Sequence, residues 1–116
     1  MTMTSRTLTV LICTHNRSSL LLRTLYYLNM ARRPQGWQVD ILVVTNACTD
    51  NSLEGLEQYR EENKDGLPLN WIDEPTPGKS YALNRAIPLI DSELVAFVDD
   101  DHRVDSDYLA NICNAA

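Results

Sequence analysis

The chain has 116 residues, of which 44% are hydrophobic and 22% charged, and its net charge is −6. This length allows one small domain, and the composition is that of an ordinary folded protein. An acidic chain without a cluster of Lys and Arg lacks the charge pattern of a nucleic-acid-binding protein. We therefore expect no nucleic-acid partner.

The cysteines and the apolar segments of the sequence indicate the cellular compartment in which the chain is expected. The three cysteines, Cys13, Cys48 and Cys113, form no C-x-x-C pair, and an odd number without such a pair argues against a disulfide framework or a zinc site. Residues 1–7 contain no long apolar run, so no signal peptide is predicted. No stretch approaches the roughly 20 apolar residues of a membrane helix. We expect a cytoplasmic chain, which is compatible with a longer, membrane-associated parent protein.

Strand-like and helix-like patterns alternate along the sequence. Continuous β-branched and aliphatic runs predict strands at residues 7–13, 39–44, 69–72 and 93–98. Amphipathic patterns predict helices at residues 17–30, 50–62, 80–87 and 105–113. Asn16 or Ser18 is the expected N-cap of the first helix, Asn51 with Glu54 resembles a capping box for the second, and Pro88 ends or kinks the third.

This order predicts a single α/β domain over residues 1–116, with a mostly parallel sheet covered by helices on both faces. Right-handed crossovers give the strand order 3-2-1-4. Ligands bind beyond the carboxyl ends of such strands. Four loops therefore become candidates for a site, at residues 14–17, 45–49, 73–79 and 99–103.

The strongest chemical signal is a run of three aspartates, Asp99, Asp100 and Asp101, directly after the fourth predicted strand. Adjacent carboxylates repel, so the folded site needs solvent, a cation or a hydrogen-bonding ligand. Carboxylate oxygens at a strand end suit a hard divalent ion that also binds a diphosphate. Strand alternation places Asp99 and Asp101 on one side and Asp100 on the other, so we expect Asp100 to contribute less. The alternative is a solvated acidic turn that caps the last helix.

Two further segments carry polar groups to the same edge of the sheet. Residues 13–17 (CTHNR) leave the first strand and suit a base or ribose, with Arg17 near a phosphate, although simple helix capping is the alternative. Residues 77–84 (PGKSYALN) form a glycine turn and a helix start with Lys79, an arrangement that favours anions. A surface lysine is the alternative there. No nucleophile pairs with His15, so we do not predict it as a catalytic base.

Together these segments resemble family 2 glycosyltransferases of the GT-A fold, from about residue 8 to residue 109. Residues 9–17 (TVLICTHNR) look like the family's opening strand and turn, and residues 41–52 (ILVVTNACTDNS) like its VVDNGSTDGS segment. Residues 78–84 (GKSYALN) are similar to GKxxALN, and residues 97–101 (FVDDD) to the metal-binding D-x-D. The resemblance implies a Rossmann-like sheet. It also implies inverting transfer of a sugar from a nucleotide-diphosphate sugar, preferably a UDP-sugar, to a saccharide or other hydroxyl acceptor.

The resemblance also implies the site residues. At the nucleotide sugar it places Thr14, Asn16, Arg17, Thr45, Asn46, Gly78, Lys79, Asn84, Asp99 and Asp100, and it assigns Mg²⁺ or Mn²⁺ to Asp101 and Asp99. Thr45 stands where the family usually has an aspartate that reads the base, which leaves the base open. Ala47 and Cys48 replace the family's Gly and Ser. The family's general base lies after the D-x-D strand on the acceptor half, so no catalytic base is assigned here.

Other classes of α/β domain would carry different residues at the ends of the first and fourth predicted strands. A dinucleotide-binding dehydrogenase needs a glycine-rich turn after the first strand, and residues 13–17 contain no glycine. A receiver domain would carry its acidic pair after the first strand and not the fourth. A nucleotidyltransferase-like domain and a non-catalytic sugar-nucleotide-binding fragment stay open. We expect the acceptor half to be missing from this chain, and an exposed apolar patch or sheet edge near the fourth strand that allows self-association.

Overall fold

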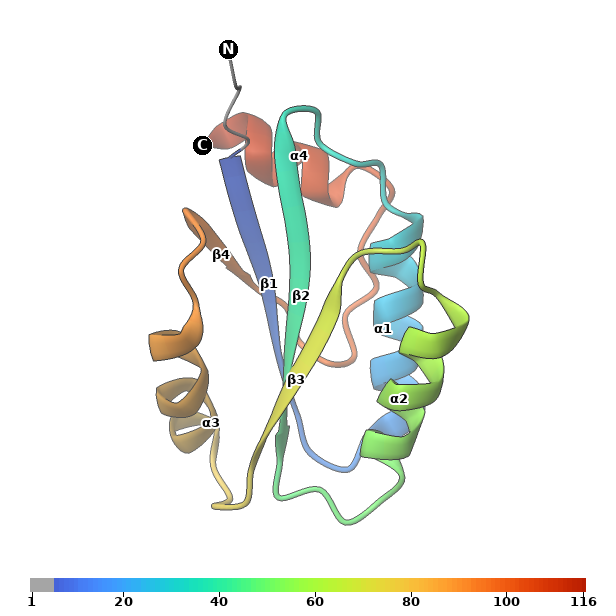
Figure 1. Ribbon diagram of the computed structural model, residues 1–116, viewed down its shortest axis with the longest axis vertical. Helices are drawn as coiled ribbons and strands as arrows, with labels where there is room; N and C mark the ends of the chain where they lie inside the picture. Colours follow the sequence, from blue (N-terminus) through green and yellow to red (C-terminus); the bar gives the residue numbers. More distant parts are fainter. Residues whose placement is uncertain (1–5) are drawn as a thin grey trace.

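The computed structural model describes residues 6–116, and its four strands form one parallel sheet in the order β3-β2-β1-β4 (Figure 1). The strands are β1 (Arg6–Thr14), β2 (Trp37–Asn46), β3 (Leu69–Glu74) and β4 (Leu94–Phe97). The helices are α1 (Ser18–Met30), α2 (Ser52–Glu62), α3 (Lys79–Ala86), the 3-10 turn η1 (Ile87–Leu89) and α4 (Tyr108–Ala115). The predicted parallel sheet and strand order are confirmed. Residues 1–5, which carry most of the segment on which the signal-peptide prediction rests, lie outside the described residues. Within residues 6–116, no helix has both the length and the apolar character needed to cross a membrane.

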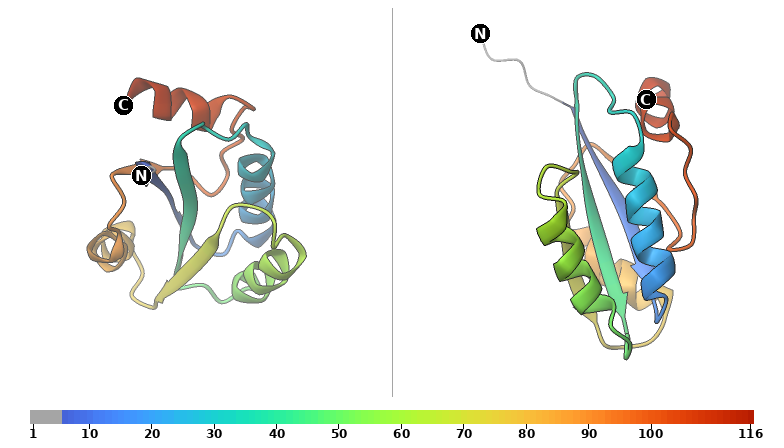
Figure 2. Two further views of the ribbon diagram at one scale, coloured as in Figure 1. Left: turned by 45° about the horizontal axis from the view of Figure 1, so that its top comes forward. Right: turned by 90° about the vertical axis from the view of Figure 1, so that its right-hand side faces the viewer.

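Helices cover both faces of the sheet, but the two cores differ in size (Figure 2). Successive residues of β1 point to opposite faces, so Leu8, Val10 and Ile12 face one core and Leu11 the other. The larger core lies under α1 and α2 and also takes Leu109 and Cys113 from α4. The smaller core lies under α3. Its fully buried members are Leu11, Val44, Ala82 and Ala86.

Asp50 accepts hydrogen bonds from residues at the N-terminal ends of both α1 and α2. Asp50 Oδ1 accepts hydrogen bonds from the Ser52 amide at 3.0 Å and from the Ser52 hydroxyl, and Asp50 Oδ2 accepts one from the Ser18 amide at 3.3 Å. The predicted N-cap of α1 is wrong, because Arg17 occupies that position. Asn51 occupies the N-cap position of α2 as predicted, but its side chain makes no capping bond. Asp50 lies in the β2–α2 loop and reaches the first turn of α1, 32 positions earlier in the chain. No local sequence pattern encodes this contact.

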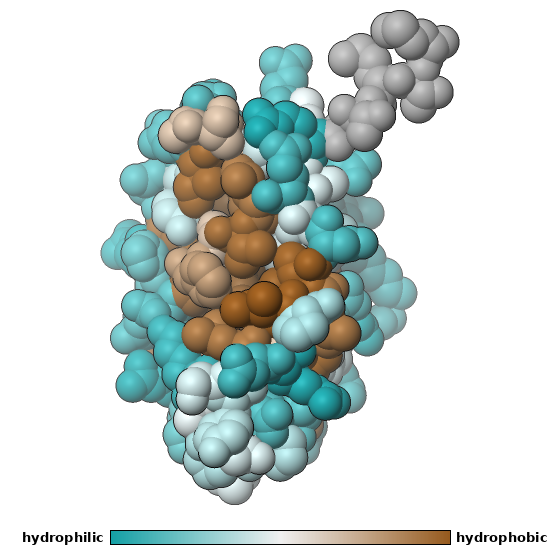
Figure 3. All heavy atoms as spheres, turned by 90° about the vertical axis from the view of Figure 1, so that its left-hand side faces the viewer, coloured by the Kyte–Doolittle hydropathy of each residue, from teal (hydrophilic) through white to brown (hydrophobic). Residues whose placement is uncertain are grey.

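The outer face of β4 is apolar and exposed. Within the described residues β4 pairs only with β1, so its other edge is free. The large exposed apolar side chains on this side of the molecule are Tyr81, Ile87, Leu89, Val95 and Phe97. Figure 3 shows apolar side chains gathered over the face that carries α3, η1 and β4. The predicted apolar patch near the fourth strand is therefore present, and we call these five residues the β4 patch.

Candidate functional site

Loops from four elements converge on one open cleft of about 560 Å³. The cleft lies beyond the carboxyl ends of the strands, at the edge where parallel α/β sheets bind ligands. Its lining residues are Cys13, Thr14, His15, Arg17, Asn46, Pro77, Gly78, Lys79, Asp99, Asp100 and Asp101. The structure thus brings together most of the predicted site residues. Asn16, Thr45 and Asn84 are not part of the lining.

The acidic run does not continue the alternation of β4. The strand ends at Phe97, and the His102 amide donates to the Asp99 carbonyl at 3.1 Å, which closes a turn. Asp100 and Asp101 occupy the middle of this turn. Because alternation requires extended backbone, the prediction that Asp99 and Asp101 share one side of a strand is wrong.

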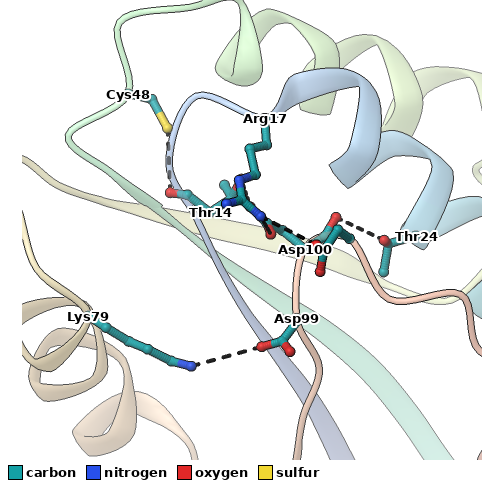
Figure 4. Close-up of polar contacts among 8 residues, drawn as sticks. Thr14, Arg17, Thr24, Cys48, Lys79, Asp99 and Asp100 are labelled. Atoms are coloured by element: carbon teal, nitrogen blue, oxygen red, sulfur yellow. Dashed lines mark hydrogen bonds and ion pairs between the residues drawn. The ribbon is translucent and has the colours of Figure 1, made fainter.

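The three carboxylates have two different basic partners, and Figure 4 shows Asp99 directed toward Lys79 and Asp100 toward Arg17. Asp99 Oδ1 lies 3.9 Å from Lys79 Nζ, on the α3 side of the cleft. Arg17 Nη1 lies 3.4 Å from Asp101 Oδ2 and 3.5 Å from Asp100 Oδ1. Asp100 and Asp101 therefore share one guanidinium, and Asp99 stands apart from both.

Asp100 differs from its neighbours in burial. The residue is 7% exposed, whereas the side chains of Asp99 and Asp101 are 72% and 50% exposed. The Thr14 hydroxyl donates to Asp100 Oδ2 at 2.9 Å, and the Thr24 hydroxyl of α1 donates to the Asp100 carbonyl at 2.9 Å. A buried carboxylate without partners would be strongly destabilising. Here each buried side-chain nitrogen or oxygen of residues 6–116 has a hydrogen bond.

The two exposed carboxylates are suitable donors for a divalent cation. Asp99 and Asp101 both line the cleft and offer hard oxygen ligands of the kind that Mg²⁺ and Mn²⁺ bind. In the described part of the chain, no three His, Cys, Asp or Glu side chains converge on one metal position. One exposed carboxylate is nevertheless enough for Mg²⁺, which usually takes one or two protein carboxylates and completes its shell with water and substrate phosphates.

Three predicted ligand residues have their side chains engaged within the protein. Asn46 is 7% exposed, and its Nδ2 donates to the carbonyls of Glu74 at 3.0 Å and Thr76 at 2.7 Å. Its Oδ1 accepts the Gly78 amide at 2.9 Å, so Asn46 holds the loop between β3 and α3. Asn16 Oδ1 accepts the amides of residues 49 and 50. Thr45 is fully buried, and its hydroxyl donates to residue 73 at 2.8 Å.

Three lining residues, Cys13, His15 and Pro77, were not among the predicted site residues, although all three lie in the segments 13–17 and 77–84 that the sequence indicated. His15 Nδ1 lies 2.8 Å from the Asn46 carbonyl, which ties the loop after β1 to the end of β2. Burial raises the pKa of the Cys13 thiol, although Lys79 lowers it, so the thiol is neutral at neutral pH. The available signal was position alone, since Cys13 and His15 fall at the carboxyl end of the first predicted strand.

The comparison with known families decides the identity. Residues 9–116 match the model of the family described as Glycosyl transferase family 2. The chain belongs to this family. Among curated relatives, this family 2 chain is 27% identical over 103 residues to the beta-monoglucosyldiacylglycerol synthase of Nostoc sp. (strain PCC 7120 / SAG 25.82 / UTEX 2576). That alignment covers 89% of the chain and 22% of the relative.

Solved structures of similar proteins confirm the GT-A fold. The mannosyltransferase PcManGT from Pyrobaculum calidifontis, in complex with GDP-Man and Mn²⁺, is 29% identical with a TM-score of 0.82, over 91% of this chain and 31% of that one. TarS 1–349 of S. aureus in complex with UDP-GlcNAc is 28% identical with a TM-score of 0.75, over 92% and 30%. The family 2 chain described here thus spans less than a third of these relatives.

Proposed function

We propose that the cleft binds the nucleoside diphosphate of an activated sugar together with Mg²⁺ or Mn²⁺, for inverting transfer of the sugar to a hydroxyl acceptor. The proposal rests on one observation: Arg17, Lys79 and the exposed carboxylates of Asp99 and Asp101 line the same cleft at the carboxyl ends of the strands. The named complexes of similar structures with GDP-Man and Mn²⁺, or with UDP-GlcNAc, support the same ligand class. We assign no general base.

The charge of the cleft favours the binding of a metal ion together with the phosphates. Three aspartates and two cations line the cleft, so one negative charge is in excess before any phosphate enters. A phosphate charge placed 4 Å from a carboxylate is opposed by about 4 kcal/mol at an effective dielectric constant of 20. Arg17 and Lys79 offset part of this repulsion. A divalent ion between the phosphates and Asp101 offsets more, because it carries two charges at shorter distances.

The base of the nucleotide has to be tested directly. We expect a UDP-sugar to be preferred, as the family resemblance implies. Thr45, at the position where the family usually has a base-reading aspartate, is buried and donates its hydroxyl to Asp73. UDP and GDP are therefore compared side by side.

Isothermal titration calorimetry of UDP and GDP, with Mn²⁺ or with EDTA, tests the proposal. We expect binding in Mn²⁺ and an affinity at least ~10-fold lower in EDTA, equivalent to about 1.4 kcal/mol. Asp101→Asn should cause a similar loss in Mn²⁺. Asp65→Asn is the matched control, since it removes an exposed carboxylate that does not line the cleft. Equal binding in EDTA, or no binding of either nucleotide, refutes the proposal. Pyrophosphate release from a nucleoside triphosphate would instead favour a nucleotidyltransferase.

A further inference from the structure

Asp100 is the only charged residue that is buried among residues 6–116. Its two neighbours in the acidic run are exposed and contact only the ends of long basic side chains. Exposed ion pairs of this kind hold a backbone weakly. The buried side chains of Val98 and Val104 anchor the chain on either side of the turn. Between them, the position of residues 99–102 depends on what holds Asp100.

Asp100 is held by three hydrogen-bonding side chains from β1, the following loop and α1 (Figure 4). Thr14 at the end of β1 donates to Asp100 Oδ2 at 2.9 Å, and Arg17 lies 3.5 Å from Oδ1. Thr24 from the buried face of α1 donates to the Asp100 carbonyl at 2.9 Å. Thr14 and Thr24 are 2% and 1% exposed, so both bonds lie away from solvent. These contacts fix the side chain and the backbone of one residue at the same time.

We propose that Asp100 is a positioning residue that pins the turn of residues 99–102 against β1 and α1, so that Asp99 and Asp101 are held ready for the metal and the diphosphate. Asp100 lines the cleft, but Thr14 and Arg17 engage its two carboxylate oxygens, so it acts through its neighbours and does not itself contact the ligand. The inference rests on the proposed function for its ligand, and on the contacts of Thr14, Arg17 and Thr24 for its geometry.

Asparagine and alanine substitutions at position 100 distinguish a positioning residue from a residue that binds the ligand directly. An asparagine at position 100 still offers one oxygen that accepts the Thr14 hydroxyl, although its amide nitrogen cannot accept from Arg17. An alanine loses both side-chain contacts and keeps only the Thr24 bond to its carbonyl. Asp100→Asn should therefore preserve the turn and Asp100→Ala should release it. At Asp101, a proposed metal ligand, Asn and Ala should be equally harmful because both remove the charge.

The first measurement is ¹⁵N relaxation of the ligand-free protein. We expect Asp100→Ala to lower the order parameters of residues 99–102 while the strands keep theirs, and Asp100→Asn to leave the turn as rigid as in the unsubstituted chain. A rigid turn in Asp100→Ala overturns the proposal. This measurement needs no nucleotide, so it judges the role of Asp100 even if the proposed function fails.

The second measurement is the affinity for UDP or GDP in Mn²⁺. We expect at least a 10-fold loss for Asp100→Ala and less than a 3-fold loss for Asp100→Asn. An equal loss in both variants would mean that the Asp100 charge contacts the ligand, and it overturns the proposal. Absence of binding by the unsubstituted chain refutes the proposed function and leaves the relaxation result to decide on Asp100.

A third variant, Thr24→Val, tests the proposal without substituting Asp100, in case Asp100→Ala does not fold. Thr24→Val removes the donor to the Asp100 carbonyl but keeps the shape of a core side chain outside the cleft. Thr9→Val is its matched control, since Thr9 is a buried threonine of β1 that does not contact Asp100. We expect a 3- to 10-fold loss of nucleotide affinity for Thr24→Val and less for Thr9→Val. Equal effects of the two variants count against the pinning of the turn.

Discussion

Replacement of Asn46 by alanine should loosen the wall of the cleft that carries Lys79. The amide side chain makes three hydrogen bonds to the loop before α3, with the carbonyls of Glu74 and Thr76 and the amide of Gly78. A hydrogen bond of this kind contributes about 1 kcal/mol net, so the loss of all three is worth about 3 kcal/mol at most. Since the loop is exposed and water can replace part of the lost bonding, we expect a decrease in the free energy of unfolding of about 2 kcal/mol.

Urea denaturation at neutral pH measures this decrease. Asn46→Asp should be at least as harmful, because a carboxylate oxygen would then face the two carbonyls that the amide group now serves. Asn70→Ala is the matched control, as Asn70 is exposed on β3, and we expect a change within about 0.5 kcal/mol. A change of the same small size in Asn46→Ala would refute the reasoning. Unchanged stability combined with a loss of nucleotide affinity would instead make Asn46 a direct ligand contact.

Three further predictions follow from local geometry. Hydrogen bonds from Ser52 and Ser18 outweigh the effect of burial and lower the pKa of Asp50, so its contribution to stability is present above pH ~3.8 and is lost as pH falls through the lowered pKa. Asp50→Ala should destabilise by about 1 to 2 kcal/mol at pH 7 in urea denaturation, and an equal difference at pH 2 would contradict this origin. Ala47 has φ of 51°, so Ala47→Gly should relieve strain and raise the free energy of unfolding by about 0.5 kcal/mol net of the added chain entropy; a lower melting temperature would speak against it. Phe97 is 59% exposed in the β4 patch, and sedimentation velocity should show concentration-dependent self-association that Phe97→Ser weakens, whereas a strict monomer at all concentrations would exclude association through this patch.

The fold was predictable because its signals are local and repeated. Alternating apolar runs and helical patterns gave the elements, and the handedness of crossovers gave the strand order that the structure has. The convergence of four loops at one edge followed from the parallel direction of the strands.

The internal contacts of the site were not predictable, because their partners lie far apart in the sequence. Asp100 bonds to Thr14 across 86 positions, and Asn46 bonds to Gly78 across 32. A polar residue at the end of a strand can bind a ligand or hydrogen-bond to a distant loop. The sequence pattern is the same in both cases, so it cannot distinguish the two roles. The alternation argument failed for a different reason: β4 ends two residues before the acidic run, at Phe97.

The unequal cores give the cleft one stiff wall and one compliant wall. The turn with Asp100 and Asp101 rests on α1, which is embedded in the large core through Leu21, Leu25 and Leu28. Helix α3, which begins at Lys79, buries only two alanines fully, and an alanine contributes little apolar area to docking. We expect the amide hydrogens of α3 to exchange through low-energy local opening, and those of β1 and β2 only on global unfolding. We therefore expect the Lys79 side of the cleft to move more readily than the side that carries Asp100 and Asp101.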